Sequence, residues 1–408
     1  MIVKERVFQL AVLLSLINFF IASSLGVLIR TIPFLDFAVN GRFVIHSHSH
    51  VAFLGWVFVA LMALIYDTYF SGCRRVMRWF IGYLIIIQLS VFGMLVTFPF
   101  MGYAVWSIIF SSLHMGASIV FVFYFIKKSL PVHSLVKPFI WSSLLFMALS
   151  SIGPLALGPL SILGFKSGFY YDTAIYFYLH FQYNGWFTMA IIGLILSMVD
   201  ADILRARSLA IRRGFGFLIA GIVLTFLLSL LGYKPGLVFN LLGGFGALIQ
   251  LAGIYFLTPV IIIFVKMINN RFYRLIFLFA LMAMVLKFIA QFISAFPLAI
   301  DMAYYNRDLI IAYLHWVLLG FVSIALLGFI GNRIFGSIAD KKIKIVMGAF
   351  IGALLLSEMV ILLKQELINY YSAEYWHAIL LGISIVMTTA VFIFLVSTYL
   401  KVLNRDNN

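Results

Sequence analysis

The sequence contains little charge: only 10% of its 408 residues are Asp, Glu, Lys or Arg, against about 25% in a typical soluble domain. Hydrophobic residues make up 64% of the chain, and 43 residues are Phe. A soluble protein of this size cannot bury so much apolar surface, because a large share of any folded surface faces its solvent. We therefore expect the solvent of this chain to be lipid.

Cysteine is almost absent, since Cys73 is the single one. One cysteine excludes a disulfide framework, a CxxCH haem attachment and a two-cysteine copper site. The net charge of +15 does not indicate nucleic-acid binding, because the basic residues lie in short loops between apolar runs. That distribution is typical of multi-pass membrane proteins. The N-terminal apolar run is long enough to span and has no convincing cleavage site, so we expect a membrane helix rather than a signal peptide.

Twelve apolar stretches approach the length of about 20 residues that a membrane-spanning helix needs. Their predicted bounds are 7–29, 46–66, 79–98, 101–126, 138–158, 173–198, 213–232, 238–265, 274–296, 309–332, 345–365 and 376–400. These spans leave no room for a large soluble domain. We expect an all-α polytopic membrane protein in which residues 1–408 form a single integral-membrane domain.

The basic residues predict the orientation. Both termini and the loops after the even-numbered spans carry 21 of the 28 Lys and Arg residues, the opposite loops carry six, and Lys287 lies inside the ninth span. Because Lys and Arg accumulate in cytoplasmic loops, both termini are predicted to be cytoplasmic. The expected location is a bacterial-type cytoplasmic (inner) membrane.

A short motif repeats along the chain. HVAFLGW begins at His50, HFQYNGW at His180 and HWVLLGF at His315, and each copy has His, four residues and Gly. HAILLGI at His377 keeps the same spacing. The first three copies begin spans two, six and ten, four helices apart, which predicts three four-helix units around a pseudo-threefold axis.

Six of the eight His are predicted to lie near the outer ends of even-numbered spans: His46, His48, His50, His180, His315 and His377. Polar groups in spans are costly and usually face an interior site, and His is a common ligand of metals and haem. The alternative is that these His only join helices by hydrogen bonds. The glycines that follow, such as Gly55 and Gly320, fit either a flat ring or a closely packed helix.

The HSHSH string predicts two directions for its imidazoles. His46 and His50 are four residues apart and share a helix face. His48 points roughly 200° away, at about 100° per residue. One helix can therefore present His to two neighbours.

These features together resemble the core subunit (subunit I) of haem–copper oxidases and nitric oxide reductases. The resemblance implies that His50, or His46 or His48 beside it, and His315 bind a low-spin haem b. His180 stands at the family's copper position. The HxHxxxxGW string of His48, His50 and Gly55 also resembles the tenth-helix motif of C-family oxidases, in which the two His bind two haems. The family resemblance as a whole implies respiratory electron transfer, with O₂ or NO as the substrate of any reaction.

The resemblance is incomplete at the copper site. The family has two adjacent His near helix seven, and the seventh span has none. Copper or a second metal at His180, His46 and His377 is therefore an open question, as is catalysis. Two other functions stay open: a transporter or haem- or metal-handling permease, and a non-catalytic sensor or assembly partner. Partners would be the lipid bilayer and, by the resemblance, respiratory subunits or an electron donor.

Two charges are predicted deep in the membrane, Lys287 in the ninth span and Glu358 in the eleventh. Both lie about 14 positions into helices that run outward, so they could pair. An unpaired charge there costs several kcal/mol. A structural pair or a neutral side chain satisfies that cost without any function, and a proton path is the functional alternative.

Overall fold

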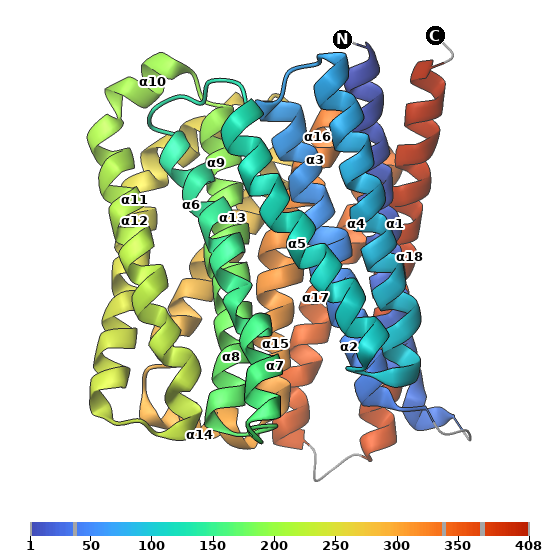
Figure 1. Ribbon diagram of the computed structural model, residues 1–408, viewed down its shortest axis with the longest axis vertical. Helices are drawn as coiled ribbons and strands as arrows, with labels where there is room; N and C mark the ends of the chain where they lie inside the picture. Colours follow the sequence, from blue (N-terminus) through green and yellow to red (C-terminus); the bar gives the residue numbers. More distant parts are fainter. Residues whose placement is uncertain (1, 36–38, 337–339, 368–371, 407–408) are drawn as a thin grey trace. The chain divides into compact units, whose positions relative to one another are not determined.

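The structure is a computed structural model, and it describes residues 2–35, 39–336, 340–367 and 372–406. Within these ranges the regular elements are all helical (Figure 1). The chain divides into two compact units: unit 1 comprises residues 1–130 and 326–408, and unit 2 comprises residues 131–325.

Unit 1 contains the first helices of the chain and the last. Its elements are α1 (Ile2–Thr31), η1 (Ile32–Phe34), α2 (Gly41–His50), η2 (Val51–Val57), α3 (Phe58–Tyr69), α4 (Arg74–Met101), α5 (Val105–Lys128), most of α16 (Ile324–Phe335), α17 (Lys341–Leu367) and α18 (Ala373–Asp406). The helix α1 packs against α18, and the start of α1 and the end of α18 lie at the same end of this unit (Figure 1).

Unit 2 contains the middle of the chain. Its elements are α6 (Lys137–Ser150), α7 (Ile152–Ile162), α8 (Phe169–His180), η3 (Phe181–Phe187), α9 (Thr188–Ser197), α10 (Ala201–Ala206), α11 (Ser208–Thr225), η4 (Phe226–Tyr233), α12 (Leu237–Met267), α13 (Arg271–Ile293), α14 (Pro297–Tyr305), α15 (Arg307–His315) and η5 (Trp316–Ser323). The helix α11 packs against α12, η3 packs against α6, and η5 packs against α13.

Within the described ranges, eleven helices are long and apolar enough to cross a membrane, and eleven of the twelve predicted spans coincide with them. These helices support a multi-pass membrane protein, because a helix satisfies its own backbone polar groups in lipid. The sixth predicted span, 173–198, is helical as α8, η3 and α9, but it is not among the eleven. Its buried polar side chains, among them Gln182 and Asn184, explain its lower hydropathy.

Local signals explain where several helices begin and end. The side chains of Asn40, Asn270 and Asn306 accept hydrogen bonds from backbone N–H groups at the starts of α2, α13 and α15, as N-cap residues do. Gly102 ends α4 with a φ of +57°, where a side chain would also collide with Phe43. The cap and the turn together position the start of α2.

The second membrane helix lies at the centre of unit 1. In Gly41–Tyr69, 83% of the most apolar window is buried, against 22% for Val105–Lys128. The predicted second span is therefore a core helix, and α5 presents most of its apolar side chains outward. The HSHSH string lies at the start of this helix, where its three imidazoles are half-buried.

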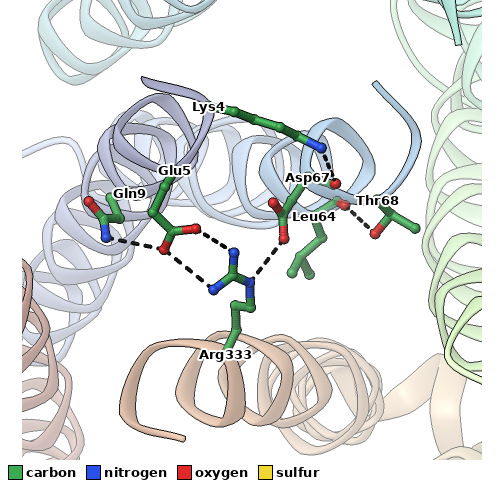
Figure 2. A network of polar contacts seen from close by, with 7 residues as sticks. All are labelled: Lys4, Glu5, Gln9, Leu64, Asp67, Thr68 and Arg333. Atoms are coloured by element: carbon green, nitrogen blue, oxygen red, sulfur yellow. Dashed lines mark hydrogen bonds and ion pairs between the residues drawn. The ribbon is translucent and has the colours of Figure 1, made fainter. Parts of the chain in front are cut away.

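A polar network joins three helix ends in unit 1 (Figure 2). Arg333 of α16 forms an ion pair with Glu5 of α1, and its Nε donates to Asp67 of α3 at 3.1 Å. Lys4 donates to the backbone oxygen of Asp67 at 2.6 Å. The network brings the start of the first span, the end of the second and the end of the tenth to one level.

Candidate functional site

The three best copies of the His–Gly motif share an unusual backbone. In each copy an α-helix ends at the His, and a π-helical segment follows: η2 after His50, η3 after His180 and η5 after His315. The step from His to Gly is five residues, which is the i→i+5 step of a π-helical hydrogen bond. His377 lies in the unbroken α-helix α18. Short π segments inside α-helices are rare overall, but a large share of them lie at functional sites. The three copies therefore mark a candidate site.

The HSHSH string presents its imidazoles to two helices, as the sequence predicts. His48 contacts α1, where its Nδ1 lies 2.8 Å from the backbone oxygen of Ala22. His46 and His50 face the end of α4, with ring centroids 6.2 Å and 4.3 Å from Phe98. The Tyr103 ring packs beside both.

Hydrogen bonds determine which nitrogens of His48 and His50 are basic. The Nδ1 of His50 lies 2.8 Å from the backbone oxygen of His46, as that of His48 does from Ala22. A carbonyl oxygen can only accept, so Nδ1 carries the proton in both rings and Nε2 holds the lone pair. This arrangement is usual for metal-binding His, in which the second nitrogen donates to a carbonyl or carboxylate.

Side chains from neighbouring helices satisfy carbonyl groups of the first π segment. His114 of α5 donates from Nε2 to the Leu54 oxygen at 3.2 Å. Asn18 of α1 donates to the Gly55 oxygen at 3.1 Å. A π turn interrupts the regular hydrogen bonding of an α-helix. The side chains of His114 and Asn18 supply hydrogen bonds to its buried carbonyl groups, which need partners. His114 and Asn18 therefore hold η2 in place.

Gly55 is explained by close helix packing. A Cβ at this position would lie 3.0 Å from Asn18 Cβ and 3.0 Å from Val91 Cγ1. The Trp56 ring stacks on Phe19 with centroids 4.4 Å apart and an interplanar angle of 7°. Of the two explanations for the motif glycine, contact with neighbouring helices is the one that the geometry supports at Gly55.

His180 differs from His48, because both of its ring nitrogens have close protein partners. His50 lies between the two, since the Tyr103 hydroxyl is 3.5 Å from its Nε2. The Nε2 of His180 donates to the Ile222 oxygen at 2.8 Å. Its Nδ1 therefore holds the lone pair and accepts from the Asn184 side chain at 3.1 Å. His180 is 1% exposed. These bonds favour a structural role, since binding a metal would require one of them to break.

The remaining predicted residues lie in both units. His315 is half-buried at the end of α15, and Gly320 is buried in η5 of unit 2. His377 is half-buried on α18 of unit 1. The proposed pair of His50 and His315 takes one residue from each unit and stays a prediction.

Lys287 and Glu358 are both buried, with 0% and 8% exposure. Lys287 of α13 contacts Thr188 within unit 2. Glu358 of α17 belongs to unit 1, where the nearby charge acting on it is that of Arg30. Their pairing also involves both units and stays a prediction.

The residues that support the π segments were not predicted from the sequence. Asn18, Thr188 and Gln291 are all buried polar residues with partners in or beside η2 and η3. The available signal was their polarity inside apolar spans, because such residues are costly in a membrane and usually have a partner.

Across residues 2–35, 39–336, 340–367 and 372–406, no three His, Cys, Asp or Glu side chains are grouped closely enough to hold a metal ion. No known protein-family model matches the sequence, and no curated protein is significantly similar to it.

Proposed function

We propose that this chain is a haem b-binding protein of a cytoplasmic membrane, similar in architecture to the core subunit of haem–copper oxidases. The observation that carries the proposal is the pair of backbone hydrogen bonds from Nδ1 of His48 and His50. These bonds hold the rings and leave Nε2 as the basic nitrogen. Both residues lie on a core helix, directly before a π segment.

In this proposal His50 and His315 are the axial ligands of a low-spin haem, and His48 is the candidate ligand of a second haem. A bound haem supplies an iron that carries one electron at a time, with a potential set by its axial ligands and burial. The chain's own residues position the ligands: Ala22 and the His46 carbonyl orient the rings, and Phe98 packs against His50.

The proposed orientation has both termini in the cytoplasm of a bacterial-type cell. The charge distribution of 21 against six basic residues supports it. The Arg333 network is consistent with it, because it joins three helix ends that the charge rule assigns to one side. The start of α1 and the end of α18 also lie at one end of unit 1 (Figure 1).

A second candidate function is transport of a polar solute. The observation that favours it is the buried polar side of the α8–η3–α9 segment, where His180, Gln182, Asn184 and Thr188 are each at most 4% exposed. Intramembrane polar residues commonly line solute pathways. A permease of this kind needs no haem.

The visible spectrum of protein purified from haem-replete cells distinguishes the two functions. A low-spin haem b protein shows sharp bands on reduction, whereas a permease shows none. His50→Ala and His315→Ala should each remove these bands, because the loss of one axial imidazole leaves the iron five-coordinate or the site empty. His133→Ala, in the loop before α6, is the matched control and should keep them. A wild-type protein without haem would overturn the proposal.

A further inference from the structure

Lys287 is a fully buried cation with few partners. Its Nζ lies 3.4 Å from Thr188 Oγ1, 4.4 Å from the centroid of the Phe288 ring and 5.9 Å from that of Tyr183. Aromatic faces attract a charged ammonium, so the two rings are weak partners of the Lys287 side chain when it is protonated.

The hydroxyl group of Thr188 accepts from Lys287 rather than donating to it. The hydroxyl proton of Thr188 is donated to the backbone oxygen of Tyr183 at 2.7 Å. An ammonium has three N–H groups and no acceptor, so one long hydrogen bond to Thr188 leaves donors for a further partner.

No carboxylate of unit 2 supplies that partner among the described side chains. The acidic residues of this unit lie at helix ends and in loops: Asp172, Asp200, Asp202, Asp301 and Asp308. Asp202 and Asp301 pair with Arg205 and Lys234, and Asp172 accepts from Tyr233. The charge of Lys287 is therefore unbalanced within its own unit.

A second polar pair lies one helical turn away. Gln291 is four residues after Lys287 on α13, and it donates to Asn184 Oδ1 at 3.4 Å. Asn184 is four residues before Thr188, so the two pairs are successive contacts between α13 and the η3–α9 segment. The Gln291 Oε1 atom is buried without a hydrogen-bond partner. Such a group usually bonds to an ordered water or ligand.

We propose that this part of unit 2 binds a small monovalent anion, with Lys287 as the anchoring cation. The anion accepts from the remaining N–H groups of Lys287, and a water of its hydration shell donates to Gln291 Oε1. A counter-ion offsets the cost of a buried charge that has no carboxylate partner in the unit. The inference does not depend on haem binding.

Thermal unfolding of the purified full chain in lipid nanodiscs tests the site. Sodium chloride is titrated against sodium gluconate at equal ionic strength, because gluconate is too bulky for a closely packed site. A ligand that binds only the folded state raises the unfolding temperature as its concentration passes its Kd. We expect a saturable, chloride-specific rise in the wild type.

The variants identify the anchor. Lys287→Met should abolish the chloride-specific rise, and Lys266→Met, an exposed lysine at the end of α12, should retain it. A wild type without a chloride-specific rise would overturn the proposal, even if Lys287→Met does not fold. An equal rise in Lys287→Met would also overturn it. So would a rise that appears only in Glu358→Gln, since that would identify Glu358 as the counter-charge.

Discussion

The first and second copies of the His–Gly motif have the same backbone and different chemistry. In both, an α-helix ends at the His and a π segment follows. His50 donates from Nδ1 to a carbonyl of its own helix and has only a long contact of 3.5 Å from the Tyr103 hydroxyl to Nε2. His180 has partners at 2.8 Å and 3.1 Å on its two nitrogens. The repeated spacing therefore specifies the helix geometry, and the neighbouring side chains determine what the imidazole can bind.

One residue accounts for much of this difference. Four positions after the His, the second copy has Asn184, while the first has Leu54 and the third has Leu319. A residue at i+4 lies beside the imidazole on the same helix face. Asn184 supplies a donor to His180 Nδ1, and a leucine cannot. We infer that the second copy is specialised as a structural unit.

The largest expected contrast is between His50→Ala and His180→Ala. His50→Ala should remove the low-spin haem bands. His180→Ala should keep them but lower the free energy of unfolding by about 1–3 kcal/mol, because it removes the bond to the Ile222 carbonyl and leaves the buried Asn184 amide without its acceptor. Reduced-minus-oxidised spectra and thermal unfolding in the same detergent measure the two effects. Loss of the bands in His180→Ala alone would reverse the assignment of roles.

The motif glycines provide a second contrast. A Cβ at residue 185 would lie 2.5 Å from Phe146 Cγ, whereas at residue 55 the nearest atoms are 3.0 Å away. Gly185→Ala should therefore destabilise the protein by about 1–3 kcal/mol, the usual cost of overpacking, and Gly55→Ala by less. Chemical unfolding measures both.

Phe146→Ala provides the control for this steric explanation. The double variant Gly185→Ala with Phe146→Ala should lose less stability than the two single changes added together. Strict additivity would show that the ring is not the obstacle.

The helices could be predicted from the sequence, whereas contacts between distant residues could not. Composition and apolar runs predicted the helical membrane fold and eleven of its spans, because length and hydropathy are local properties. The prediction that His48 and His50 face different neighbours was confirmed, since His48 contacts α1 and His50 contacts α4. The bond from His180 to Ile222 and that from Gln291 to Asn184 could not be predicted, since each joins residues that are distant in the chain.

Asn184→Leu should make the second copy resemble the first. The change removes the donor to His180 Nδ1 and the acceptor for Gln291. We expect the free energy of unfolding to fall by about 1–2 kcal/mol, since buried polar groups lose their partners. Asn184→Asp keeps the acceptor for Gln291 and serves as the matched variant. An unchanged unfolding temperature in Asn184→Leu would show that these bonds do not distinguish the copies.

Chemical labelling of Cys73 is expected to have the smallest effect on the protein. It shows on which side of the membrane the second span ends, and hence on which side the first copy of the motif begins. Cys73 is exposed between α3 and α4, at the end of its span opposite His46. A hydrogen bond with the Ser71 side chain lowers the pKa of the Cys73 thiol. The thiolate is the reactive form, so alkylation should accelerate with pH and reach half its maximal rate below the ordinary thiol pKa.

An impermeant maleimide should label inside-out vesicles and spare intact cells, without changing any haem band. Labelling of intact cells would place Cys73 outside, and the His ends of the motif helices would then face the cytoplasm.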